Sequence, residues 1–393
     1  MKVTVKKRNL DAALQVASLA VGSGEDSDIA THYLIWHDLK TGVTTLLAQD
    51  GKRLVAESPI LECTVETDAT GDGDGFSVPG WRFRAFLNAV EDGEEVISLT
   101  RQADRSIKAQ AKGGSGKWGS LNPKDWPFWT TTLTDAKVVA TISAAHFTNI
   151  LSYAKKFVSD QESRSPAIVA AECRNGVVNV TDSVGVVLLK SPKLKDSTLR
   201  VHGKDITSLI SFLGVVGEGD VDILEHNRIL FLQRSGTTVR IGASRWIHDF
   251  PILGNIDADA SKPSMASFRV NTAEFLKAMT FLLAFGKKDD GDIYFRFDDP
   301  NIILSMRSGS GSTEEEQQVL PCIESTNMAD IKSDGNPGFT LTKRYLESVA
   351  TTFGEETMLF RVDVTKKNGY VSFFHERDGD TYYTAIVWIK SPR

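Results

Sequence analysis

Apolar and polar positions along the chain follow one order that occurs six times. Each copy begins with a strand-like tetrad, such as "GFSV" at 75–78, and an apolar anchor follows five residues after the tetrad ends. The anchor opens an apolar set at i, i+3, i+4 and i+7, which lies on one face of a helix. The six anchors are Leu10, Phe83, Phe147, Ile206, Phe275 and Leu346. The pattern therefore predicts a strand followed by an amphipathic helix in each copy.

Two or three runs with strand character follow each expected helix. In the first copy they are "HYLIWHDL", "TTLLAQ" and "RLVAES", and turn signals such as "RNG" at 174–176 separate such runs elsewhere. The sequence thus predicts a βαβββ repeat, present six times from Lys2 to the C-terminal region. Regular self-similarity is typical of an architecture assembled from one supersecondary unit.

The repeats are expected to pair into domains. "KDWPFW" at 124–129 closes the second repeat and "HDFPIL" at 248–253 closes the fourth, each with Asp, an aromatic residue and Pro. Proline ends ladder pairing and the aromatic side chain can fill the bottom of a small core. A length of 393 residues is long for one core and suits three. We therefore predict domains at 1–133, 134–258 and 259–393.

Burial of each helix's apolar stripe predicts an α+β architecture with two layers. Six βαβββ repeats with their helices on one side of a continuous antiparallel sheet would give a curved slab. The helices would line the inside and the strands would form the outside. Each of the three domains would contain two repeats.

Composition narrows the class of protein. The sequence has no run of 18 apolar residues and its N-terminus lacks a signal-peptide pattern, so we expect it to stay in the cytoplasm. Its three cysteines are Cys63, Cys173 and Cys322, which have neither pairing nor metal-site spacing. They are expected to be reduced residues of an intracellular protein.

The net charge of −6 argues against nucleic-acid binding, but its distribution argues for it. The six expected helices together carry +9, so the rest of the chain carries −15. Helices that share one face would attract a polyanion such as duplex DNA, while the strand side would repel it. The alternative is that these lysines and arginines are ordinary charges of solvated helix surfaces.

The whole chain resembles the β sliding clamp of bacterial DNA polymerase III. The signatures are "VPGWRF" at 78–83, "DWP", "VTDSVGVVLL" at 180–189, "HDFP" and the last strand "YYTAIVWIK", and their order and spacing carry the resemblance. It implies a processivity factor: a head-to-tail homodimer that closes as a ring around duplex DNA and tethers DNA polymerase. The divergence from cellular clamps favours a phage or mobile-element version, acting in the bacterial cytoplasm or nucleoid.

The resemblance implies sequence-independent contacts to double-stranded DNA from the helices. The residues expected to face the duplex are Lys7, Arg8, Arg82, Arg84, Lys155, Lys156, Lys204, Lys277, Lys343 and Arg344. One difference from the family argues against transferring all of its DNA contacts to this chain. The loop after the first helix is basic in the family, whereas here it reads "GSGEDSDIAT".

The resemblance also implies a pocket that takes short linear peptides from the polymerase and the clamp loader. Its expected lining is Pro166, Thr181, Ser183, Val184, Val186, Pro251, Ile256, Ala385 and Val387. Ser183 and Val184 stand where the family commonly has Gly and His, which puts the peptide specificity in doubt. Core packing is the alternative for the apolar members, above all Val186 and Val387.

Ring closure would join an edge strand of the first domain to one of the third. Trp118, Leu283 and Phe285 are the candidate dimer contacts, and a core position is the alternative for Trp118.

Enzyme chemistry finds little support in the sequence. The seven histidines are scattered without metal-ligand spacing, and "GGSGKWGS" at 113–120 has Trp where a phosphate loop needs Ser or Thr. We therefore expect no catalytic site, metal or cofactor. Two alternatives stay open: a clamp-like partner-binding protein without ring closure, and a ligand-binding protein or enzyme on a repeated α+β scaffold.

Overall fold

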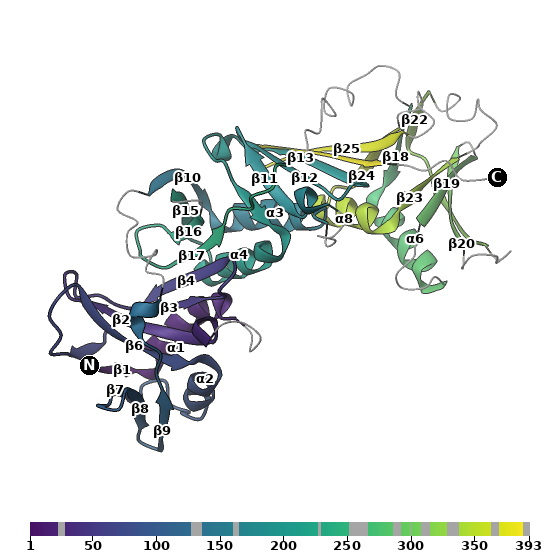
Figure 1. Cartoon of the computed structure of the whole chain (residues 1–393). Coiled ribbons are helices and arrows are strands. Elements are labelled where there is room, and N and C mark those ends of the chain that lie inside the picture. The colour runs from purple at the N-terminus through teal and green to yellow at the C-terminus, as the bar shows by residue number, and fades with distance from the viewer. Residues whose placement is uncertain are drawn as a thin grey trace. The chain divides into compact units, whose positions relative to one another are not determined.

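Figure 1 shows the helices and strands of the computed structural model. The chain divides into two compact units. The first unit comprises residues 1–149 and 204–246, and the second comprises 150–203 and 247–393. The structure describes residues 1–22, 28–126, 136–159, 165–226, 229–250, 266–285, 292–298, 300–307, 315–327, 338–362 and 369–387.

All six predicted strand–helix pairs are confirmed, each helix starting directly after its strand. They are β1 (Lys2–Lys6) with α1 (Lys7–Ala17), β6 (Gly73–Pro79) with α2 (Gly80–Asn88), β10 (Lys137–Ser143) with α3 (Ala144–Lys155), β14 (Arg200–His202) with α4 (Gly203–Val216), β18 (Ala266–Asn271) with α6 (Thr272–Phe285), and β23 (Gly338–Thr342) with α8 (Lys343–Phe353).

Three main strands follow each helix, so the βαβββ repeat is confirmed as well. They are β2 (His32–Asp38), β3 (Thr44–Gln49) and β4 (Leu54–Pro59); β7 (Val96–Arg101), β8 (Ser106–Ala111) and β9 (Gly114–Gly119); β11 (Ala170–Arg174), β12 (Val177–Thr181) and β13 (Gly185–Lys190); β15 (Asp220–His226), β16 (Ile229–Arg234) and β17 (Arg240–Ser244); β19 (Asp292–Asp298), β20 (Asn301–Arg307) and β21 (Glu315–Pro321); and β24 (Thr357–Val362), β25 (Tyr370–Arg377) and β26 (Asp380–Val387). Two short strands, β5 (Thr64–Glu66) and β22 (Glu324–Thr326), lie at sheet edges.

The apolar stripes form the cores of the repeats. All six anchors are buried, with at most 1% of each side chain exposed. Phe86 and Ile210 are the stripe members that keep partial exposure among those described. The spacing of i, i+3, i+4 and i+7 therefore identified the buried face of every helix.

Consecutive repeats exchange their first strands. β1 pairs with β7 of the second repeat, while β6 pairs with β2 of the first. The same exchange joins β10 to β15 and β14 to β11, and later β18 to β24 and β23 to β19. Repeats are thus coupled as one–two, three–four and five–six, the coupling that the three-domain prediction assumes. The domain boundaries themselves stay a prediction.

The expectation of one continuous sheet is wrong, because the described strands form four antiparallel sheets. The first unit contains a five-stranded sheet, β5-β1-β7-β8-β9, and an eight-stranded sheet, β10-β15-β16-β17-β4-β3-β2-β6. The second contains a nine-stranded sheet, β14-β11-β12-β13-β26-β25-β24-β18-β22, and a four-stranded sheet, β21-β20-β19-β23. Because the two repeats of a coupled pair exchange their first strands, their strands fall into two different sheets. The β4–β17 and β13–β26 pairings then join strands of different coupled pairs into one longer sheet.

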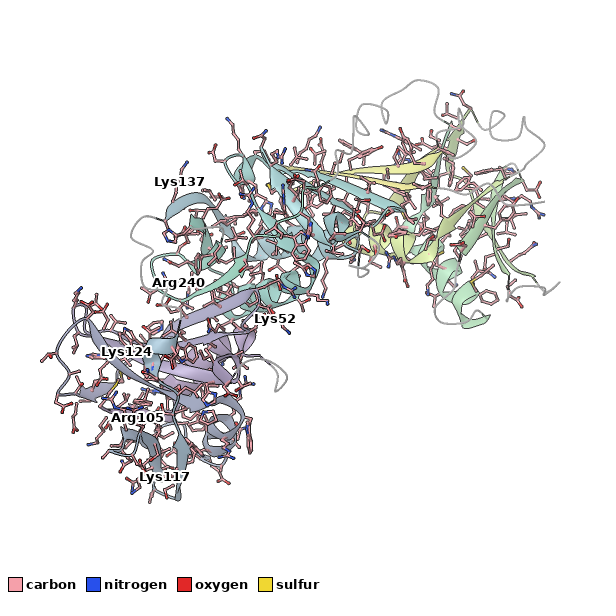
Figure 2. The ribbon with its side chains drawn as sticks, in the orientation of Figure 1. Lys52, Arg105, Lys117, Lys124, Lys137 and Arg240 are labelled. Carbon is pink, nitrogen blue, oxygen red and sulfur yellow. The ribbon has the colours of Figure 1, made fainter. Side chains whose placement is uncertain are left out.

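The β4–β17 junction contains two ion pairs with little exposure. Arg240 lies directly opposite Glu57, and its Nε donates to Glu57 Oε2 at 2.8 Å. Beside them, Arg53 Nε donates to Asp205 Oδ1 at 3.0 Å. Arg240 is buried, whereas Lys117, labelled at the lower margin of Figure 2, is exposed. Paired and hydrogen-bonded charges are what a buried polar junction requires.

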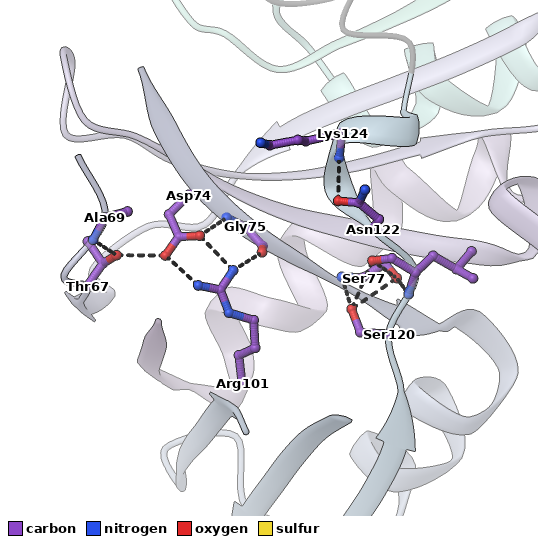
Figure 3. Close-up of polar contacts among 10 residues, drawn as sticks. Thr67, Ala69, Asp74, Gly75, Ser77, Arg101, Ser120, Asn122 and Lys124 are labelled. Atoms are coloured by element: carbon purple, nitrogen blue, oxygen red, sulfur yellow. Dashed lines mark hydrogen bonds and ion pairs between the residues drawn. The ribbon is translucent and has the colours of Figure 1, made fainter. Parts of the chain in front are cut away.

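A second polar network fixes β6, the strand that leads into α2 (Figure 3). Asp74 accepts from Arg101 Nη1 at 2.7 Å and from the Thr67 hydroxyl at 2.7 Å, and Arg101 also donates to the Gly75 carbonyl at 2.9 Å. Burial raises the pKa of Asp74, but the bonds from Thr67 and Arg101 outweigh it, so the pKa lies below its usual value.

Candidate nucleic-acid interface and partner surface

The predicted cations of α1 are engaged by carboxylates of the first unit. Lys7 Nζ lies 2.7 Å from Asp11 Oδ2 on the same helix face. Arg8 forms an ion pair with Glu94 and lies 3.6 Å from Glu62. An exposed pair contributes only about 0–1 kcal/mol, so a phosphate can compete for the cation. The remaining carboxylates would still repel that phosphate, which makes α1 a weak part of the expected interface.

Arg84 and Lys156 are turned toward neighbouring side chains. Arg84 Nε donates to the Tyr33 hydroxyl at 2.5 Å, and its guanidinium lies 5.5 Å from the Tyr33 ring centroid. Lys156 Nζ donates to Thr352 Oγ1 on α8 at 2.9 Å, and burial lowers the pKa of this lysine. Both side chains act in packing within their own compact unit.

Four predicted cations form neither an ion pair nor a hydrogen bond with another side chain among the described residues. They are Arg82 on α2, Lys155 on α3, Lys277 on α6 and Lys343 on α8. Each of these four helices therefore presents at least one positive charge that no acidic side chain of the described chain neutralises. These four are the strongest candidates for phosphate contacts, because phosphate binding needs cations that are not already neutralised.

The last two predicted cations belong to local clusters. Lys204 is exposed at the start of α4, next to Asp205 in sequence; burial raises the pKa of that aspartate, and the charge of Lys204 opposes the shift in part. Arg344 forms an ion pair with Asp182, and its guanidinium lies 4.7 Å from the ring centroid of Tyr345.

The helix bounds also reduce the expected charge of the helices. Lys6 and Lys156 fall just outside α1 and α3, and Lys287 and Lys288 lie outside the described residues. Without these four lysines, the helices carry a net charge of +5 instead of +9. The sign of the segregation holds, since the whole chain carries −6.

The expected peptide-binding residues of β13 and β26 lie on neighbouring strands of the second unit. Val186 is opposite Ala385, and the Val387 N–H donates to the Val184 carbonyl at 2.9 Å. Val184 and Val387 are partly exposed, which leaves an apolar patch at this end of the strand pair. Ala385 is buried in a cluster with Leu188 and Tyr383, against which Val186 packs, so these two positions serve the core.

The turn between β12 and β13 is held in a defined shape. Asp182 Oδ1 accepts from the N–H groups of Val184 and Gly185, and Thr181 Oγ1 donates to the Gly185 carbonyl. Ser183 has a φ of 81°, a conformation that favours Gly. The Asp182 carboxylate also accepts from Arg344 and from the Tyr345 hydroxyl of α8.

The sequence predicts a DNA contact for Arg344 and gives no role to Asp182 or Tyr345. The order Thr-Asp-Ser-Val-Gly is a signal for an Asx-type turn, which identifies Asp182 as a structural residue. Its distant partners on α8 have no local sequence signal.

Two further predicted pocket residues, Pro251 and Ile256, lie outside the described residues. Pro166 begins a short 3₁₀ helix, Pro166–Ile168, directly before β11.

Comparisons with known proteins identify the architecture. Protein-family models and curated protein sequences gave no match to the chain. The DNA polymerase sliding clamp of Bacillus subtilis superposes with a TM-score of 0.78 at 14% identity, covering 100% of both chains. The DNA polymerase III subunit beta of Pseudomonas aeruginosa gives 0.76 and 14% at the same coverage. A Eubacterium rectale protein, provisionally described as a DNA polymerase III beta subunit, gives 0.80 and 15%, again over both whole chains. The chain has the β sliding-clamp fold.

Each of the four described sheets ends in strands with one unpaired side, and β9 and β21 are two of these edge strands. β9 is the last strand of the five-stranded sheet in the first unit, and β21 is the last strand of the four-stranded sheet in the second. The predicted dimer contact Trp118 lies on β9 but is buried, with its ring edge-on to Phe83 at 6.3 Å and to Phe86 at 5.8 Å. This burial favours the core role that the sequence left open. The side chains of Leu283 and Phe285 lie outside the described residues.

Two further observations concern metals and membranes. The described residues contain no group of three or more His, Cys, Asp or Glu side chains suited to a metal ion. No helix in this part of the chain combines the length and apolar character needed to cross a membrane.

Proposed function

We propose that this chain is a DNA polymerase processivity factor, a sliding clamp that encircles duplex DNA. The observation that carries the proposal is the full-length likeness to sliding clamps, with a TM-score of 0.80 and coverage of 100% of both chains. The segregation of positive charge onto the helices supports it independently. The three domains of this proposal are 1–133, 134–258 and 259–393.

The proposed DNA contacts depend on phosphate attraction without reading of base sequence. Arg82, Lys155, Lys277 and Lys343 are its main cations, since they lack carboxylate partners in the described chain. The paired cations of α1 contribute less. Weak and salt-screened contacts suit a ring that slides, because topology rather than affinity retains the DNA.

The proposed ring is a head-to-tail homodimer in which β9 of one copy pairs with β21 of the other. Both are edge strands, and pairing would satisfy their unpaired backbone groups. Charge is compatible with this choice: β21 carries Glu316, which could replace Asp104 as the partner of the exposed Lys117 on β9. The exposed Val319 of β21 adds apolar surface to this edge.

The proposed partners besides DNA are the polymerase and the clamp loader, bound through short linear peptides at the patch formed by Val184 and Val387. The patch is apolar and partly exposed, and the ordered turn at Asp182 lies beside it, which suits an extended apolar peptide segment. The protein would act in the cytoplasm and would catalyse no reaction, since tethering alone raises the effective concentration of the polymerase.

The phosphate contacts can be tested by replacing the four unpaired cations with glutamine. The observable is the slope of log affinity for a linear duplex against log salt, whose magnitude falls by about 0.9 for each phosphate that is no longer neutralised. The variant Arg82→Gln/Lys155→Gln/Lys277→Gln/Lys343→Gln should therefore lower the magnitude of this slope by about 3 to 4.

The matched control replaces four exposed lysines outside the α-helices, Lys112, Lys124, Lys137 and Lys195, with glutamine. It removes the same net charge but should leave the slope close to that of the wild type. An equal decrease in both variants would show that the helices have no special role in DNA binding.

The dimer is tested by sedimentation. The wild type should have twice the 43.1 kDa mass of the chain, whereas Val319→Asp should be monomeric. Leu61 is as exposed as Val319, at 61%, but belongs to neither β9 nor β21, so Leu61→Asp should remain dimeric. A wild-type chain that is monomeric at micromolar concentration would favour the alternative of a clamp-like partner-binding protein without ring closure.

A further inference from the structure

Trp81 is an exposed aromatic side chain on the basic helix α2. It is 71% exposed, against 47% for Phe374 and 42% for Phe281, the other large exposed aromatic residues of the described chain. A single exposed apolar residue is normal at a protein surface, so the exposure of Trp81 becomes informative only together with the charge beside it. The helix itself gives no packing reason for a tryptophan at this position.

The local sequence explains why Trp81 faces solvent. The buried residues of α2 are Gly80, Phe83 and Leu87, and β6 supports the start of the helix. Trp81 lies two positions before Phe83, which places it roughly 200° around the helix from this anchor. The indole therefore projects from the side opposite the core.

Arg82 completes a composite surface with Trp81. Its guanidinium carbon lies 5.0 Å from the centroid of the Trp81 ring, within the range of a cation–π contact. Arg82 lacks a carboxylate partner in the described chain, and α2 contains no acidic residue. The pair thus combines an aromatic face with a positive charge that is available to an anion.

We propose that Trp81 and Arg82 form a stacking platform for an unpaired base of single-stranded nucleic acid. Aromatic rings stack on bases regardless of sequence, and arginine can add a phosphate or cation–π contact. In a duplex the base faces are covered by neighbouring bases, so a phosphate site alone has no need of an indole. The inference rests on the proposed function because that function directs α2 toward DNA, and it adds a contact to unpaired template beside the duplex.

The test is the affinity of the full chain for fluorescein-labelled oligo(dT), measured by fluorescence anisotropy at low salt. Stacking on one base corresponds to roughly a fivefold to hundredfold loss of affinity when Trp81 becomes Ala. Trp81→Phe keeps an aromatic face and should stay within a few-fold of the wild type. Phe374→Ala removes an exposed aromatic residue from β25 and should change nothing.

Duplex affinity is measured in parallel and should be the same for Trp81→Ala and the wild type. The proposal is overturned if the wild type does not bind oligo(dT), or if Trp81→Ala binds it equally well. Equal losses for oligo(dT) and duplex would assign Trp81 to general DNA contact instead. Loss of peptide binding with unchanged oligo(dT) binding would assign it to a protein partner. Absence of duplex binding by the wild type would instead refute the proposed clamp function, which separates the two failures.

Discussion

The buried ion pair between Arg240 and Glu57 offers a quantitative test of the junction between β4 and β17. Both side chains are buried, and Arg240 also lies 5.7 Å from the ring centroid of Phe231. Burial raises the pKa of Glu57 even though Arg240 opposes the shift. Arg240→Met keeps apolar packing at the position but leaves the carboxylate without its counter-charge. Removal of one partner from a buried pair costs about 3–5 kcal/mol.

The cost should depend on pH in a defined direction. A buried carboxyl group whose pKa is raised in the folded state is favourable when protonated, and this advantage is lost as pH rises through the folded pKa. The destabilisation by Arg240→Met should therefore be larger at pH 8 than at pH 5. The double variant Glu57→Met/Arg240→Met removes both charges, and its stability should lie within about 1 kcal/mol of the wild type.

Hydrogen exchange is the suitable assay, because a chain with two compact units need not unfold in one step. A loss of 3–5 kcal/mol corresponds to amide exchange in β4 and β17 that is roughly a hundredfold to several thousandfold faster. The matched control is Lys40→Met, which breaks the exposed pair with Asp72 in the same unit and should leave exchange in β4 and β17 close to that of the wild type. Similar acceleration by Arg240→Met and Lys40→Met, or a double variant as unstable as the single one, would refute the reasoning.

Two further predictions concern single aspartates. Burial raises the pKa of Asp205 to about 6, against an ordinary value of 3.8. The protonated carboxyl group therefore contributes stability to the folded state that is fully present below about pH 4 and is lost as the pH rises to about 6. Asp205→Asn should therefore be more stable than the wild type by up to about 3 kcal/mol at pH 8 and equal to it near pH 4, as measured by hydrogen exchange in α4. A less stable variant at pH 8 would contradict this. Asp182→Ala removes the turn contacts and the partners on α8, and should cost about 2–3 kcal/mol and accelerate exchange in β12 and β13. The control Asp38→Ala removes a comparable turn bond from the Lys40 N–H and should cost about 1 kcal/mol. Equal costs for the two variants would show that the α8 contacts of Asp182 do not stabilise the fold.

The repeat was predictable because its signal is local. An anchor such as Phe83 and its set at i+3, i+4 and i+7 depend on helix periodicity alone, and burial of all six anchors follows from it. The pairings of β4 with β17 and of β13 with β26 join segments far apart in sequence. Hydrophobic patterning fixes which face of a strand is buried but does not name the neighbouring strand, so the single continuous sheet was a wrong prediction.

The sequence predicts which residue types the candidate site contains, but it does not predict which basic residues form ion pairs with carboxylates. Basic residues on helices were visible in the sequence, yet Arg8 is held by Glu94 and Arg344 by Asp182 across long sequence separations. The partners come from loops and turns whose approach depends on the tertiary fold. Trp118 was ambiguous for a similar reason, because its contacts with Phe83 and Phe86 form only after β9 packs against α2.

The central claim is that two copies of the chain form a closed ring around duplex DNA. The direct measurement is retention on a nicked circular duplex, assembled by mixing dissociated chains with the circle and then restoring conditions that favour the dimer. Protein that co-elutes with the circle should be released when a single restriction cut linearises the DNA, and Val319→Asp should never be retained. Retention that survives linearisation, or a dimer that is never retained on the circle, would contradict the claim.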